Sequence, residues 1–215
     1  EGAHVGARAQ GVHARALVQG AAEHGVEVND VITIVLLFPQ IGQGVRGVDD
    51  DAAHGGVNDV LAAHLGLEKL SSFVITSRED GVTESIGRVG TLPAPMTVED
   101  FARTVKERLG VTHVRLAAAA ARPVRRAAVC GGAGAEFIDD AVRRGADVYV
   151  TGDVKYHDAQ RAVEQGMHII DAGHFGTEAP VLPVLAAHLR AELASEHGEI
   201  EIFVTNTQRD VFDVI

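Results

Sequence analysis

From Pro123 to its last residue, the chain alternates short apolar segments with helical segments, and only short turns separate them. Several of these turns are built on glycine, as at Gly145 and Gly166. The pattern predicts strands at 126–129, 147–150, 168–170, 200–205 and 211–215, and helices at 136–144, 153–166 and 174–196. Alternation of this kind indicates an α/β fold, in which a mostly parallel sheet is flanked by helices.

The chain ahead of this region is less regular. Residues 51–116 predict a helix over 58–65, a pair of strands at 72–76 and 86–92, and a helix that Thr97 caps and Gly110 ends. Residues 1–50 predict a helix at 12–24 and a buried strand at 31–38. We therefore divide the sequence into an N-terminal segment, residues 1–50, and an α/β domain, residues 51–215.

Composition excludes several classes of protein. The net charge of −11 opposes nonspecific binding to nucleic acid, which depends on Lys and Arg. The longest apolar run, 31–38, is far shorter than the ~20 residues of a membrane span. Cys130 is the single cysteine, so there is no intrachain disulfide, and a reducing, cytoplasmic location is expected. Cys130 itself is expected to be a small buried residue rather than a nucleophile.

The sharpest candidate site is the segment DAGHFGTE, residues 171–178, which follows a predicted strand. Ligand sites in parallel sheets lie at the carboxyl ends of strands. His174 and Glu178 are four residues apart, so on a helix they face the same side and can share one metal ion. An imidazole with a carboxylate suits Zn, Mn, Fe or Co. The alternative is a polar helix N-terminus in which Glu178 only complements the helix dipole.

Two further strand ends carry candidate residues. In TGDVKYHD, residues 151–158, Asp153 either lines a pocket or caps its own helix, and His157 lies one turn further along near the same crevice. Gly131, Gly132 and Gly134 form a glycine-rich turn. Such a turn either binds a phosphate group through its amides or only connects a strand to a helix. The Rossmann and Walker spacings are both absent.

Three blocks together resemble the Nif-three-like family, whose members are often labelled GTP cyclohydrolase I type 2 homologues. The blocks are VCGGAG (129–134), GADVYVTGDVKYHDA (145–159) and DAGHFGTE (171–178), in matching order and spacing. The segments GGVND (55–59) and IGRVGTL (86–92) also resemble parts of that family. The resemblance covers about residues 51–215 and does not extend to the N-terminal segment.

The resemblance implies a two-lobed α/β fold, a dinuclear divalent-metal site between the lobes, and a toroidal homohexamer. By alignment, the family's metal ligands fall on His174, Glu178 and Asp51. The family also uses an adjacent pair of histidines, and this chain has no two adjacent histidines. The first lobe is therefore expected to be truncated or divergent, and the chain is expected to hold at most one tightly bound metal ion.

The function implied by the resemblance is that of a divalent-metal-binding protein with an impaired site. It would act as a metal-dependent hydrolase on a nucleotide or another phosphorylated small molecule. In that hypothesis His157 shuttles a proton, and the turn at Gly131, Gly132 and Gly134 holds a phosphate group. The alternative is a noncatalytic metal-binding or scaffold protein that interacts with other proteins.

Overall fold

A computed structural model describes residues 32–36, 55–79, 82–193, 200–204 and 209–214. The chain divides into two compact units. The first unit comprises residues 1–50 and 182–209, and the second comprises residues 51–181 and 210–215. Residues 182–209 thus group with the N-terminal segment, although their sequence continues the α/β pattern. The helix predicted at 12–24 lies outside the described residues.

In the first unit, two strands from distant parts of the sequence pair with each other. Strand β1 (Ile32–Leu36) runs parallel to β8 (Ile200–Val204), with Ile34 opposite Ile202. Nearly all of helix α8 (Val181–Leu193) belongs to this unit, and its Arg190 donates a hydrogen bond to the carbonyl oxygen of Ile202. The strands predicted at 31–38 and 200–205 are therefore confirmed.

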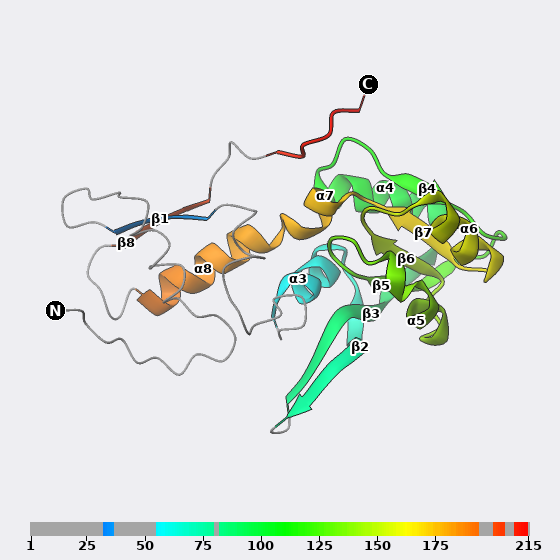
Figure 1. Cartoon of the computed structure of the whole chain (residues 1–215), viewed down its shortest axis with the longest axis horizontal. Helices are drawn as coiled ribbons and strands as arrows, with labels where there is room; N and C mark the ends of the chain where they lie inside the picture. Colours follow the sequence, from blue (N-terminus) through cyan, green and yellow to red (C-terminus); the bar gives the residue numbers. More distant parts are fainter. Residues whose placement is uncertain (1–31, 37–54, 80–81, 194–199, 205–208, 215) are drawn as a thin grey trace. The chain divides into compact units, whose positions relative to one another are not determined.

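The second unit is built on a six-stranded sheet with the order β2-β3-β5-β6-β7-β4 (Figure 1). Its strands are β2 (Glu68–Glu79), β3 (Val82–Met96), β4 (Arg115–Ala117), β5 (Val124–Val129), β6 (Val148–Thr151) and β7 (His168–Asp171). Its helices are α3 (Val57–His64), α4 (Val98–Leu109), α5 (Ile138–Arg143), α6 (Tyr156–Glu164) and α7 (His174–Glu178), with a 3-10 turn η1 (Ala135–Phe137) before α5. The α/β fold with flanking helices is confirmed.

The sheet is mixed, which corrects the prediction of a mostly parallel one. Only β5, β6 and β7 run parallel to one another. Strands β2 and β3 form an antiparallel hairpin, β3 is antiparallel to β5, and β4 is antiparallel to β7. The short link between β2 and β3 dictates this, because only antiparallel strands can be joined by a tight turn. The hairpin extends beyond the other strands of the sheet (Figure 1).

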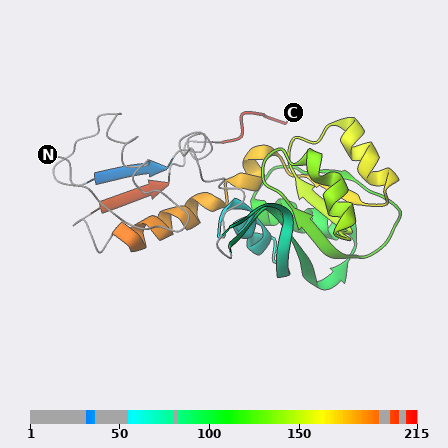
Figure 2. The ribbon, with the colours of Figure 1, turned by 60° about the horizontal axis from the view of Figure 1, so that its bottom comes forward.

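Helices lie on both faces of the sheet, so the unit has three layers (Figure 2). A cluster of buried apolar side chains fills the space on each face. Val148 and Val150 of β6 join the core formed with helices α3 and α4. Tyr149, between them, joins the opposite core formed with α5 and α6. Successive residues of a strand point to opposite faces, and burial of both faces explains why these strands are almost continuously apolar.

Three predicted elements differ in the structure. Helix α6 begins at Tyr156, later than predicted, because Asp153 has a φ of 55° that a right-handed helix cannot include. The helix predicted at 174–196 is two helices, α7 and α8, since Pro180 lacks the amide hydrogen that would continue the first. Residues 211–214 are irregular rather than a strand, and the amide of Phe212 donates to the Asp210 side chain.

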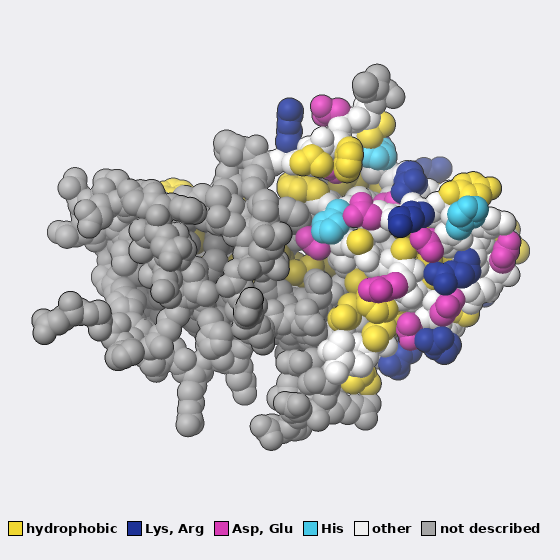
Figure 3. Space-filling view, in the orientation of Figure 1, with side chains coloured by type: hydrophobic (Ala, Val, Ile, Leu, Met, Phe, Trp, Pro, Cys, Tyr) yellow, Lys and Arg dark blue, Asp and Glu magenta, His cyan; other side chains and the backbone are white. Residues whose placement is uncertain are grey.

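Among the described residues, none of the helices combines the length and the apolar character needed to cross a bilayer. On the face of the second unit shown in Figure 3, acidic and basic side chains are interspersed, and neither sign forms a large patch.

His168 is a fully buried histidine at the start of β7. Its Nδ1 accepts a hydrogen bond from the amide of Ala119 at 3.0 Å, and its Nε2 finds no partner among the described residues. Burial lowers the pKa of His168, and the positive charge of Arg122 lowers it further. The folded protein therefore holds this imidazole in its neutral form.

We expect His168 to make the protein less stable in mild acid. Below about pH 6.5 the unfolded chain takes up a proton that the folded state resists, so stability falls with pH until the lowered folded pKa is reached. The loss is at most about 1.4 kcal/mol per pH unit in that window. Chemical unfolding of His168→Asn, which keeps an acceptor for Ala119, should show a smaller loss between pH 7.5 and 5.5 than the unmodified chain. An identical loss would contradict this account.

Candidate metal centre at the ends of three parallel strands

The carboxyl ends of β5, β6 and β7 bring all three predicted strand-end segments together. Beyond the strands, the loops stay hydrogen-bonded to one another. The amide of Gly152 donates to the carbonyl of Gly132 at 2.8 Å, and that of Ala172 donates to the carbonyl of Thr151 at 2.9 Å. Gly132, Asp153 and His174 are therefore neighbours, as expected for the carboxyl edge of a parallel sheet.

His174 and Glu178 are the first and last residues of α7 and face the same side of it, as the spacing predicts. Nε2 of His174 lies 3.3 Å from Oε1 of Glu178. The imidazole is half exposed, with 47% of its side-chain surface accessible, and the Glu178 side chain is less so, at 23%. The pair is open to solvent on one side and backed by the strand-end loops on the other.

The carboxylate of Asp153 contacts Nδ1, the second nitrogen of the His174 imidazole. Its Oδ2 lies 2.9 Å from Nδ1 of His174. Of the two alternatives for Asp153, the cap of its own helix is wrong, because Lys155 occupies the cap position of α6. The left-handed backbone of Asp153 turns its carboxylate back toward β7 instead.

His174 is thus flanked by carboxylates at both ring nitrogens. A neutral imidazole has a single N–H, so if Nδ1 donates to Asp153, the lone pair of Nε2 faces the Glu178 carboxylate. A protonated ring avoids this repulsion, and so does a cation placed between Nε2 and Oε1. For ligand bonds of about 2.1 Å, a separation of 3.3 Å corresponds to an angle of about 100° at the ion, close to tetrahedral or octahedral geometry. The pair therefore fits a divalent metal ion.

The amides of the glycine-rich turn are occupied by hydrogen bonds to side chains. Each of its three glycine amides already donates a hydrogen bond to a side-chain oxygen. The pairs are Gly131 with Asn58 Oδ1 at 2.9 Å, Gly132 with Thr177 Oγ1 at 2.9 Å, and Gly134 with Thr151 Oγ1 at 3.0 Å. These amides are not free to bind a phosphate group, so the geometry favours the strand-to-helix turn over the phosphate cradle.

Gly132 nevertheless lines the candidate site. Its φ of +66° is left-handed, and a Cβ there would lie 2.4 Å from Oε1 of Glu178 and 3.3 Å from Nε2 of His174. Only glycine allows the turn to come this close to the pair. The Gly132 backbone therefore forms the wall against which the Glu178 carboxylate rests.

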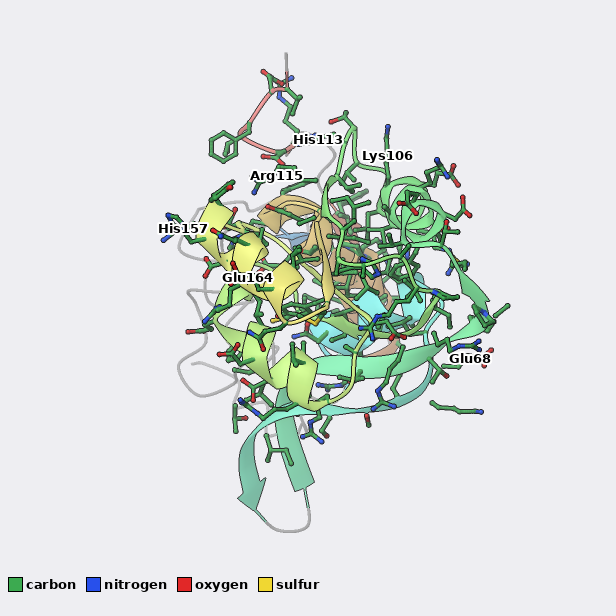
Figure 4. The ribbon with its side chains drawn as sticks, turned by 90° about the vertical axis from the view of Figure 1, so that its right-hand side faces the viewer. Glu68, Lys106, His113, Arg115, His157 and Glu164 are labelled. Atoms are coloured by element: carbon green, nitrogen blue, oxygen red, sulfur yellow. The ribbon has the colours of Figure 1, made fainter. Side chains whose placement is uncertain are left out.

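His157, in contrast, is not brought to the His174–Glu178 pair. His157 is exposed in the first turn of α6, its ring meets the edge of Tyr156, and it points outward from the unit (Figure 4). Asp51 lies outside the described residues. Within the described part of the chain, no group of three or more His, Cys, Asp or Glu side chains is arranged to hold a metal ion.

Cys130 and Tyr149 lie beneath the glycine turn. Cys130 is buried, as predicted. Burial raises the pKa of Tyr149 well above its usual value, and the neighbouring Cys130 raises it further. Tyr149 therefore stays protonated and donates to the carbonyl of Gly134 at 2.8 Å. The pair supports the turn rather than the chemistry of the site.

Sequence reasoning missed several residues that support the site. Asp171 and Arg115 form an ion pair beside Asp153, and nothing in the sequence pattern linked β4 to β7. Asn58 follows the GGV of the 55–59 segment, and Thr177 lies inside the 171–178 segment. Both residues lie in segments that resemble the family, but their roles depend on contacts between distant parts of the chain.

Comparisons with known proteins agree with this fold. A family model described as Duf34/NIF3 (NGG1p interacting factor 3) matches residues 49–211. Two solved structures share the fold. A Bacillus cereus protein related to NIF3 superposes with a TM-score of 0.71 at 23% identity, covering 77% of this chain and 71% of that one. A Staphylococcus aureus protein gives 0.69 at 27% identity, covering 77% and 66%.

Two curated relatives carry the name GTP cyclohydrolase 1 type 2 homolog. The one from Clostridium perfringens is 33% identical over 165 residues, which is 77% of this chain and 61% of the relative. The one from Bacillus subtilis is 33% identical over 156 residues, which is 73% of this chain and 41% of the relative. The chain thus spans about 40 to 60% of the length of these relatives. With a family model matched over most of its length, this chain belongs to the Duf34/NIF3 family.

Proposed function

We propose that this chain binds one divalent metal ion through Nε2 of His174 and the carboxylate of Glu178. The observation that carries the proposal is the placement of His174 between two carboxylates, with a separation of 3.3 Å between Nε2 and Oε1. Asp153 acts as the outer partner that fixes the orientation of the ring, an arrangement common to metal-binding histidines. Asp51 is the proposed third ligand, and the ion is Zn, Mn, Fe or Co.

We further propose that the site serves metal-dependent hydrolysis of a nucleotide or another phosphorylated small molecule. A bound divalent ion supplies a water of lowered pKa, which is a nucleophile near neutral pH. The name of the curated relatives, GTP cyclohydrolase 1 type 2 homolog, supports this substrate class. Because the glycine amides are engaged, a phosphate group would be bound by groups outside the glycine turn.

The second candidate is a noncatalytic metal-binding or scaffold protein. The closed glycine turn and the exposed, outward position of His157 favour it, since the described residues then offer neither a phosphate cradle nor a proton shuttle. The homohexamer and the cytoplasmic location stay predictions, and both fit either candidate.

The first test is the metal content of the purified chain. The unmodified protein should contain about one divalent ion per chain, because the pair supplies two ligands to one ion. His174→Ala should contain almost none, and His113→Ala, which removes an exposed histidine of the loop before β4, should keep the ion. Elemental analysis of the three proteins, purified in parallel, measures this. Equal metal in all three would contradict the proposed site, and two ions per chain would contradict the single-metal proposal.

A second test separates the two candidate functions. With metal present, the hydrolase predicts opening of the GTP ring that is lost in Glu178→Gln, because the amide is a weaker metal ligand than the carboxylate. Ring opening is followed by ultraviolet absorbance and by mass spectrometry of the product. Metal binding without turnover of GTP or other nucleotides would favour the noncatalytic candidate.

Gly132→Ala should weaken metal binding while losing no more stability than a comparable glycine substitution away from the site. Gly145→Ala is the matched control, since Gly145 has a similar φ of +70° and open space around its Cβ position. Each variant should lose about 1 to 2 kcal/mol from the left-handed backbone. Only Gly132→Ala should displace the Glu178 carboxylate and reduce zinc affinity, measured by competition with a chelating dye. The same zinc affinity in both variants would show that Glu178 is not a ligand.

A further inference from the structure

The carboxylate of Asp171 joins the two loops that carry Asp153 and His174. Its Oδ2 accepts the amide of Val154, the residue after Asp153, at 3.0 Å. Its Oδ1 accepts the amide of Gly173, the residue before His174, at 3.0 Å. One buried side chain thus fixes the backbone on both sides of the Asp153–His174 contact.

Arg115 completes this arrangement from the neighbouring edge strand. Asp171 and Arg115 are directly opposite each other in the β4–β7 pairing. One guanidinium nitrogen, Nη2, donates to Oδ2 of Asp171 and to the carbonyl oxygen of Val154 at 2.7 Å. The buried carboxylate therefore has a counter-charge, without which its burial would be costly. Arg115 and Asp171 together hold both the amide and the carbonyl of Val154.

The backbone needs this support. Asp153 is left-handed at φ 55°, a conformation that is unfavourable for a residue with a Cβ. Gly173 has φ 78° and ψ 153°, a region open only to glycine. The carbonyl oxygen of Gly173 accepts the first amide of α7, that of Thr177, at 3.2 Å. Its own amide, and the amide that follows Asp153, are both held by Asp171. These contacts lie on both sides of the close approach of Asp153 Oδ2 to His174 Nδ1, which is 2.9 Å.

We propose that Asp171, paired with Arg115, is a positioning residue of the metal site. It sets Asp153 against Nδ1 of His174, which fixes the proton on Nδ1 and leaves the lone pair of Nε2 for the metal ion. Asp171 touches neither the ion nor a substrate in this role. The inference rests on the proposed metal site for its effect on affinity, but the Asp153–His174 contact itself exists without metal.

The test compares Asp171→Asn with a control substitution at an aspartate that has similar contacts but lies at the opposite ends of the strands. Asp147 likewise accepts two backbone amides, those of Arg125 and Arg126, and pairs with Arg122. Asp147→Asn therefore removes an equivalent set of contacts away from the site. Arg115→Met is the second site variant. Its side chain is largely exposed, so the substitution threatens folding less than a change at Asp171.

Two measurements are made on each full-length variant, after thermal unfolding has shown that it folds. Zinc affinity by dye competition should fall about tenfold or more in Asp171→Asn, the range found for partners of metal-binding histidines. It should fall less in Arg115→Met and stay within about twofold in Asp147→Asn, which lies too far away to couple to the site. In metal-free protein, nitrogen-15 NMR should show the His174 Nδ1–H in the unmodified chain and in Asp147→Asn, and its loss in Asp171→Asn.

These outcomes separate the inference from the proposed function. If Asp171→Asn and Arg115→Met both bind zinc as tightly as the unmodified chain and keep the Nδ1–H signal, the positioning role is wrong. If the unmodified chain binds no zinc, the proposed function fails, and the Nδ1–H signal alone decides the positioning role. If Asp147→Asn loses zinc affinity to the same extent as Asp171→Asn, the effect is one of general stability and the inference is overturned.

Discussion

The close approach of three parallel strand ends is the constraint on which the rest of the site depends. Strands β5, β6 and β7 stop at nearly the same level, and hydrogen bonds continue from loop to loop beyond them. Loops packed this closely leave little room for side chains, which is why Gly132 lies against the Glu178 carboxylate. The sheet therefore gathers residues from distant segments at one edge, as expected for ligand sites of α/β proteins.

Charge is concentrated at this edge. Asp153 follows β6, Asp171 ends β7 and Glu178 ends α7. The His174 imidazole lies between the carboxylates of Asp153 and Glu178. Arg115 forms an ion pair with the buried Asp171. Beside His174, a protonated ring or a bound cation would each relieve the contact between Nε2 and the Glu178 carboxylate. The proposed divalent ion, held by Nε2 and Oε1, would relieve this contact with both carboxylates in their charged form. The contacts around His174 thus support metal binding by His174 and Glu178 independently of their spacing in the sequence.

Local features of the sequence predicted local features of the structure. The Thr97 cap, the spacing of His174 and Glu178 on one face of a helix, and the burial of Cys130 all follow from neighbouring residues, and all three are confirmed. Strand direction was not predictable in this way. An apolar strand has the same sequence pattern in either direction. The short link makes β2 and β3 antiparallel, but the antiparallel pairings of β3 with β5 and of β4 with β7 became clear only from the structure.

Long-range contacts account for what the sequence did not reveal at the site. The link between Arg115 and Asp171 spans 56 residues and depends on the short strand β4, which carries no distinctive pattern. Asp153 looked like a helix cap because aspartate often is one, and only its left-handed backbone shows that it turns toward His174 instead. The engagement of the glycine amides likewise depends on side chains from α3, β6 and α7.

The central claim, that one metal ion is bound between His174 and Glu178, is tested most directly by anomalous X-ray scattering from crystals of the zinc-loaded chain. The account predicts a single strong anomalous peak about 2.0 to 2.2 Å from Nε2 of His174 and from a Glu178 carboxylate oxygen, with Asp153 still at Nδ1. A peak bound elsewhere, or a site at which Nδ1 rather than Nε2 is the ligand, would contradict it.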